Sequence, residues 1–270
     1  MNAQANEPIA PPATSKSRKT LLWVAAVFLM FAAIVYQRRT GPTYPARGHF
    51  EIAGTSHAYK LVRSEYSSTD ARVAIPDPGP AVSGELVWKR FKTQDDWHRL
   101  PLTREGAELV ARLPAQPAAG KLEYFLELSA PSGPLRIPAE GEATEEPTII
   151  IRFKDHVPPL LLWSHVTFMF FSVLIGMRTG LAALFAPATM RFWAWVTLVG
   201  LTIGGMVLGP FVQKYAFGHY WTGFPFGGDL TDNKMLIMWV AWILACSVIG
   251  LKPKRKSSSA ASWCWWRRSR

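Results

Sequence analysis

The sequence predicts a membrane protein of mixed α plus β class, with four transmembrane helices and one antiparallel β-sandwich outside the cytoplasm. Two observations predict this architecture. Apolar residues concentrate in four runs, whereas residues 40–155 have the composition of an ordinary soluble domain. Within that domain, short segments alternate apolar and polar residues, as strands with one buried face do. A chain of 270 residues has room for both parts.

The first apolar run, residues 21–36, is expected to form a transmembrane signal anchor over residues 21–37. It is slightly short for a span of about 17–25 residues, but flanking polar side chains can reach the interface. A cleaved signal peptide is the alternative, because a basic stretch precedes the apolar core. No small-x-small cleavage motif follows in residues 35–39, which favours the anchor. The first part of the chain, residues 1–20, is expected to be cytoplasmic and disordered.

Three further apolar runs predict a C-terminal membrane part over residues 157–251. The runs cover residues 157–177, 192–212 and 235–251, and each is long enough to cross a bilayer. An aromatic-rich outer loop at residues 213–233 separates the last two. The membrane part is therefore expected to contain three transmembrane helices.

Basic clusters predict how the helices are oriented. The strongest cluster, residues 252–256, follows the last helix, so the basic tail at residues 252–270 is expected to be cytoplasmic. Four crossings place the N-terminus on the same side. The short loop that carries Arg178 and Arg191 is expected on this side too. Three arginines lie on the wrong side for this rule: Arg38, Arg39 and Arg47. The orientation predicts the inner membrane of a bacterium, with both termini in the cytoplasm.

The net charge and the cysteines narrow the function classes. A net charge of +11 could indicate nucleic-acid binding, but the basic residues cluster beside apolar runs and belong to no reading module. We therefore expect the lipid bilayer as a partner and no nucleic acid. The two cysteines, Cys246 and Cys264, lie outside the soluble domain and form no CxxC or CxxCH pattern. The domain must rest on a hydrophobic core, and covalent c-type haem is argued against.

The soluble domain is placed at residues 44–154. Its alternating segments predict strands at residues 57–66, 83–91, 107–113, 121–129 and 147–154. Residues 85–129, which include a strand with Trp88, resemble a module of the immunoglobulin or fibronectin type III kind. The resemblance implies an Ig-like sandwich that binds, spaces or braces, and it brings no activity with it.

The third predicted helix carries two pairs of glycines four residues apart: Gly200 with Gly204, and Gly205 with Gly209. Small residues at this spacing let two helix backbones approach closely. They predict a packing face, within the bundle or in a homo-oligomer. Pro210 is expected to bend or end the helix.

The outer loop contains six aromatic residues between Tyr215 and Phe226, which would be costly in a fully solvated loop. We expect it to lie in the interfacial aromatic belt or to fold back against the bundle. Asp229 or Thr231 can cap the last helix.

His165 and His219 are the candidate functional residues of the membrane part. Both are expected in the outer half, and an ionisable residue in a span is a functional-site hypothesis by default. Two imidazoles could bind haem b or copper, with Asp229 and Asp232 as metal ligands or their partners. A proton or quinone site is a further alternative. The structural alternative is a hydrogen bond from His165 that fixes the loop to the second helix.

The whole arrangement resembles bacterial inner-membrane proteins of uncharacterised function. These have a signal anchor, an Ig or fibronectin III-like ectodomain and a C-terminal three-helix membrane part. The residues that carry the resemblance lie at 163–165, 213–217 and 221–234. The resemblance implies a location in a bacterial inner membrane, and it implies no activity.

The sequence favours a non-enzymatic membrane protein, a binding or accessory (assembly) subunit whose ectodomain contacts a membrane or periplasmic protein. The alternative is a haem- or metal-binding redox subunit that uses His165 and His219. A transporter is less favoured, because four helices with few buried charges offer little for a substrate path. A membrane hydrolase is disfavoured too, since no HExxH or Ser/His/Asp pattern occurs.

Overall fold

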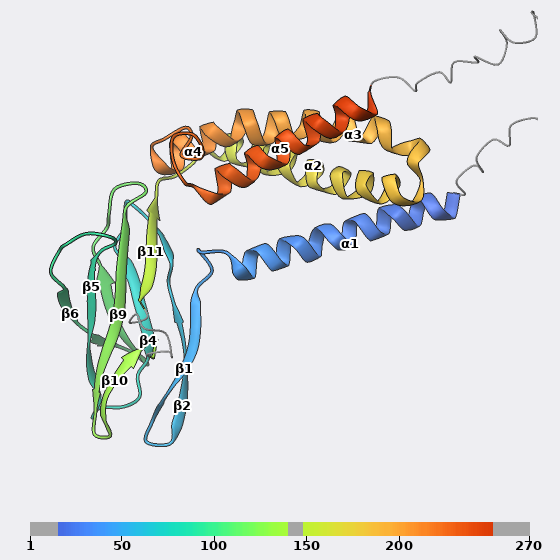
Figure 1. Cartoon of the computed structure of the whole chain (residues 1–270). Helices are drawn as coiled ribbons and strands as arrows, with labels where there is room; N and C mark the ends of the chain where they lie inside the picture. The colour runs from blue at the N-terminus through green and yellow to red at the C-terminus, as the bar shows by residue number, and fades with distance from the viewer. Residues whose placement is uncertain (1–15, 140–147, 251–270) are drawn as a thin grey trace, which may run out of the picture.

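The computed structural model describes residues 16–139 and 148–250 of the chain. Four long helical segments lie together, and a β-rich domain is attached at one end of them (Figure 1). Within the described residues, four helical segments are long and apolar enough to cross a membrane. The chain is thus a multi-pass membrane protein of α plus β class. The predicted basic tail at residues 252–270 and the first fifteen residues lie outside the described part.

The helical elements are α1 (Lys16–Thr40), α2 (Pro159–Phe185), η1 (Pro187–Thr189), α3 (Met190–Leu201), η2 (Thr202–Leu208), α4 (Gly209–Phe217) and α5 (Leu230–Ile249). α1 begins at Lys16, so residues 16–20 belong to the helix, where the sequence predicted a disordered segment. The non-helical part of the outer loop is residues 218–229, which is shorter than the predicted 213–233.

α2 continues past residue 177 to Phe185, so Arg178 lies inside a membrane-spanning helix and the prediction of a loop there is wrong. Residues 181–184, Leu-Ala-Ala-Leu, are good helix formers, and the first proline comes only at Pro187. Proline disfavours the helical conformation in the residue before it, which ends α2 at this point.

α3, η2 and α4 form one continuous helical segment, in which η2 is a π-helix. The cause is Pro210, which has no backbone N–H and whose ring displaces the preceding carbonyls. Within η2 the pattern shifts by one residue, and Gly209 N–H donates to Gly204 O. Pro210 therefore does not end the helix, which continues to Phe217.

The strands of the β-rich domain are β1 (Ala46–Ile52), β2 (Thr55–Leu61), β3 (Ser64–Tyr66), β4 (Ala71–Pro76), β5 (Ser83–Arg90), β6 (His98–Pro101), β7 (Thr103–Glu105), β8 (Glu108–Leu113), β9 (Lys121–Ala130), β10 (Gly133–Ile137) and β11 (Ile149–Lys154). They form a six-stranded sheet in the order β3-β11-β9-β5-β6 with β10 on β9, a three-stranded sheet β4-β8-β7, and the hairpin β1-β2. β3 pairs with β11 in parallel, whereas a purely antiparallel domain was predicted.

The β1–β2 hairpin has a two-residue turn, Ala53-Gly54, between the paired residues Ile52 and Thr55. Both turn residues have positive φ, 51° and 76°, which is the geometry of the tight hairpin turn that suits twisted strands. The turn fixes the register. As a result, Phe50, Ile52 and Leu61 point into the domain, and the alternate residues Arg47, Glu51 and Lys60 point out.

All three sheets contribute to one hydrophobic core. β9 buries one face of alternate residues: Leu122, Tyr124, Leu126 and Leu128 are each at most 1% exposed. The Tyr124 hydroxyl donates to Val62 O at 2.7 Å, which satisfies the one polar group this ring buries. Burial raises the pKa of Tyr124 above its ordinary value.

Candidate functional site

The candidate site lies at the end of the helices that meets the β-rich domain. We call residues 218–229 the junction loop. Asp232, in the first turn of α5, is only 7% exposed. Its Oδ2 accepts hydrogen bonds from Thr222 N at 2.7 Å, Gln213 Nε2 at 3.0 Å and Thr222 Oγ1 at 3.3 Å. One buried carboxylate thus joins α4, the junction loop and α5.

Asp229 and Asn233, which lie near Asp232 in the sequence, form the other hydrogen bonds at this end of α5. Asp229 caps α5 by accepting from Thr231 N at 2.8 Å, as one of the two predicted caps would. Asn233 Oδ1 accepts from Phe224 N at 2.6 Å. Gly223 lies so close to α5 that an added Cβ would be 2.6 Å from Asp232 Cβ. The junction loop therefore folds back on α5 and has a defined structure.

The β-rich domain is fastened to this loop by β11. The Arg152 guanidinium lies 3.8 Å from the centre of the Phe217 ring, and its Nη1 is 3.9 Å from Asp229 Oδ2. Just beyond β11, Asp155 N donates to Ala216 O at 2.9 Å. A cation over an aromatic ring and a backbone hydrogen bond hold the two parts at a defined orientation. Figure 1 shows the upper end of β11 close to α4, before the chain continues into α2.

His165 lies on α2 against the π-helical segment. Its Nδ1 is 2.9 Å from Gly204 O, and because a carbonyl only accepts, Nδ1 carries the proton. The structural alternative expected a hydrogen bond from His165 to the outer loop. In the structure His165 instead bonds to the backbone of η2. Met169, one turn along α2, also contacts Gly204. The Nε2 lone pair of His165 is not used by this bond.

His219 is exposed in the junction loop, two residues after α4 ends at Phe217. Throughout residues 16–139 and 148–250, no three His, Cys, Asp or Glu side chains gather closely enough to hold a metal ion. Asp229 and Asp232 are engaged in the cap and in the loop bonds described above. A metal or haem hypothesis thus depends on His165 and His219 without these aspartates.

The glycines of the third span face two different neighbours. An added Cβ on Gly204 would lie 2.8 Å from Phe168 Cβ, and one on Gly200 would meet Ser172 Oγ, both on α2. The same addition on Gly205 would meet the Met235 side chain on α5. Gly209 has nothing nearer than 3.7 Å. Gly200, Gly204 and Gly205 bring α2 and α5 close to this span.

Arg178 is the largest fully buried side chain of the described residues, at 2% exposure. Its guanidinium carbon is 5.6 Å from the Trp23 ring of α1, and its Nε and Nη1 have no hydrogen-bond partner there. A cation–π contact out of water contributes about 2 kcal/mol. Arg178 therefore ties α1 to α2 at the end of the bundle far from the β-rich domain.

The outer face of the six-stranded sheet carries an aromatic patch that the sequence analysis missed. Trp97, 39% exposed, packs edge-on against Phe125 with ring centres 5.2 Å apart, and Lys89 Nζ lies 4.7 Å from the indole. The Arg136 guanidinium carbon lies 3.5 Å from the centre of the Phe125 ring. The turn after β5 lies at residues 91–93, residues 94–97 lead irregularly into β6, and Asp95 pairs with Arg90 at 2.5 Å. We call Trp97, Phe125, Lys89 and Arg136 the Trp97 patch.

Fold and site together define a class: a multi-pass membrane protein with a β-rich domain fixed to one end of its helices. No model of a known protein family matches the chain. No curated protein matches it either.

Proposed function

We propose that the chain is a non-enzymatic binding or accessory subunit, whose β-rich domain stands outside the cytoplasm of a bacterial inner membrane and contacts a protein partner. The observation that carries the proposal is the junction. Arg152, Asp155 and the junction loop fix the domain on the helices, whereas a domain that only needed a tether would require none of these contacts.

The Trp97 patch is the contact surface that we propose for the partner. Trp and Arg are enriched in protein interfaces, where a few such side chains dominate the binding energy. The patch offers a half-exposed indole on a rigid sheet, flanked by two cations. Lys89 is already paired with Glu123 at 3.6 Å, so the partner that we propose is a protein with an apolar surface that covers the indole.

The test is the mass of the complex in mild detergent, measured by light scattering on the tagged full-length chain. We expect wild type to carry a partner in fixed stoichiometry, and Trp97→Ala to be reduced to the chain alone. Truncation of an interface anchor of this type costs about 2–4 kcal/mol of binding, or roughly thirtyfold or more in affinity. Tyr66→Ala is the matched control, because Tyr66 is a ring of similar exposure (37%) elsewhere on the domain. A wild-type chain that is solitary in native membranes would contradict the proposal.

A second candidate, a haem- or metal-binding subunit, is favoured by one observation. The His165 Nδ1–H donates to a backbone carbonyl, and this is the arrangement that orients a ligating histidine through its other nitrogen. The absorption spectrum of the purified protein tests haem b, which requires a Soret band lost in His165→Ala. Metal analysis of wild type and His165→Ala tests copper or zinc. A spectrum without a Soret band and an equal metal content in both proteins remove this candidate.

A further inference from the structure

The β1–β2 hairpin presents a basic face that the described part of the domain does not neutralise. Phe50, Ile52 and Leu61 point into the core, so the alternate residues Arg47, His49 and Lys60 point away from it. Arg47 and Lys60 are direct cross-strand partners in the register. Like charges directly opposite one another destabilise a strand pair. We call these three side chains the hairpin face.

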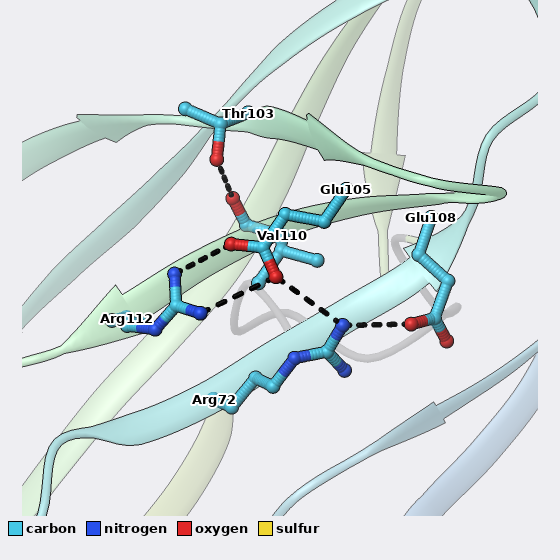
Figure 2. A network of polar contacts seen from close by, with 6 residues as sticks. All are labelled: Arg72, Thr103, Glu105, Glu108, Val110 and Arg112. Atoms are coloured by element: carbon cyan, nitrogen blue, oxygen red, sulfur yellow. Dashed lines mark hydrogen bonds and ion pairs between the residues drawn. The ribbon is translucent and has the colours of Figure 1, made fainter.

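The β4–β8 strand pair also places two basic side chains opposite one another. Arg72 and Arg112 are also direct cross-strand partners. Figure 2 shows two glutamates supplied to them from the neighbouring turn: Arg72 Nη2 lies 2.7 Å from Glu108 Oε2, and Arg112 Nη1 lies 2.7 Å from Glu105 Oε1. Two opposed arginines are thus balanced by two carboxylates within the sheet.

The hairpin face has no such balance. In the described part of the chain, neither Arg47 nor Lys60 pairs with a carboxylate, and Arg47 contacts only the Tyr44 ring at 5.4 Å. One acidic residue, Glu51, shares the face and lies further toward the hairpin turn, opposite Ser56. The face contains a surface depression of about 470 Å³, lined by Arg47, Gly48, His49, Ala58, Tyr59 and Lys60. Within the described residues, the domain supplies no carboxylate partner to Arg47 or Lys60.

The position of the hairpin indicates a source of counter-charge. In Figure 1 the hairpin forms the side of the β-rich domain from which the helices extend, and its strands run across the helix direction. It begins six residues after the last residue of α1, Thr40, and α1 ends with Arg38 and Arg39 in its last turn. The hairpin face therefore lies beside the bilayer surface, in line with the basic end of α1.

We propose that the hairpin face is a docking surface for the phosphate headgroups of anionic phospholipids in the leaflet next to the β-rich domain. Basic residues near an anionic bilayer each strengthen its binding about fivefold, hence about thirtyfold for Arg47 and Lys60 together. Arg38, Arg39 and Arg47, which break the charge rule for helix orientation, then have a common role at this surface.

The test uses the full-length chain in nanodiscs and reads amide hydrogen exchange in residues 46–61. We expect slower exchange, by up to about thirtyfold, in discs with phosphatidylglycerol than in discs of phosphatidylcholine alone. Arg47→Gln/Lys60→Gln removes this difference. Arg72→Gln/Arg112→Gln, the matched cross-strand pair, retains it. Unchanged exchange in β9 shows that each variant is folded.

Two further arms keep the outcome decisive. High salt must abolish the difference in the wild-type chain, because screening weakens exposed charge pairs. Soluble glycerol phosphate added to phosphatidylcholine discs must give no protection. The proposal is overturned by equal exchange in the two kinds of disc, by a difference that survives high salt, or by protection from the soluble phosphate. It is equally overturned if the hairpin variant retains the lipid effect.

Discussion

At the scale of single residues, a small number of polar side chains join segments of the molecule through specific contacts, which the apolar composition of the helices does not provide. Asp232 joins three segments at the junction, Arg152 fastens β11 to Phe217, and Arg178 ties α1 to α2. Each is partly or fully withdrawn from water, where a hydrogen bond or cation–π contact is stronger than on the surface. Their removal is therefore expected to have local and measurable effects.

Asp232→Ala is expected to loosen the junction loop. Thr222 N–H and Gln213 lose their shared acceptor, and an unsatisfied buried donor costs about 1–3 kcal/mol. Limited proteolysis should then cut within residues 218–229 faster than in wild type, and the thermal midpoint in detergent should fall. Lys234→Ala, an exposed residue one half-turn further, is the control and should change neither. Equal cleavage rates in wild type and Asp232→Ala would show that the buried carboxylate does not hold the loop.

Asp95 gives a prediction about pH. A hydrogen bond from Arg90 lowers the pKa of Asp95 to about 2, with a smaller contribution from Thr93. Because the folded pKa lies below the ordinary carboxyl value, the stabilisation is present above about pH 4 and is lost as the pH falls toward 2. The difference in thermal midpoint between wild type and Asp95→Asn should thus be constant from pH 7 to 5 and shrink below pH 4. A difference that grows on acidification would contradict this assignment.

At the scale of the elements, the sequence predicted the strands in which apolar and polar residues alternate regularly. The predicted strands at 83–91, 107–113, 121–129 and 147–154 correspond to β5, β8, β9 and β11. β4 was missed although Ala71, Val73 and Ile75 alternate, and β6 and β7 were missed because they are only four and three residues long. Predicted segment 57–66 is interrupted at Val62-Arg63, where the chain passes from β2 to β3. Short edge strands depend on tertiary pairing, which no local pattern contains.

The glycines of the third span give a prediction for one element. Gly204→Ala places a methyl group 2.8 Å from Phe168 Cβ and 3.2 Å from the backbone of Met169, so α2 must move. Overpacking of this kind costs about 1–3 kcal/mol. The control is Gly180→Ala on α2, which meets nothing within 4 Å and should be neutral or slightly stabilising. Unfolding of both variants by denaturing detergent measures the difference, and equal midpoints would mean that Gly204 does not set the distance between α2 and η2.

At the scale of the whole molecule, the site was predicted in its parts but not in its assembly. His165, Asp229 and Asp232 were recognised as notable, yet the partners that determine their roles lie on other segments: Gly204 on η2 and Thr222 in the junction loop. Arg152 was read only as part of a strand, and its contact with Phe217 joins residues 65 positions apart. A sequence pattern gives the chemistry of a side chain and the face it occupies. It does not give the partner that a distant segment brings to it.

The topology carries the last prediction. α1 leads into β1, β11 leads into α2, and the junction loop connects α4 to α5, so the β-rich domain and this loop lie at the same end of the bundle (Figure 1). A membrane-impermeant thiol reagent should therefore label cysteines introduced at Lys92 and at His219 from one side of intact membranes, in a chain with its own cysteines replaced. A cysteine at Thr189, between α2 and α3, should react only after the membranes are opened, since η1 lies at the opposite end. If positions 92 and 219 react from opposite sides, one of the four helical segments does not cross, and the junction could not form in a bilayer.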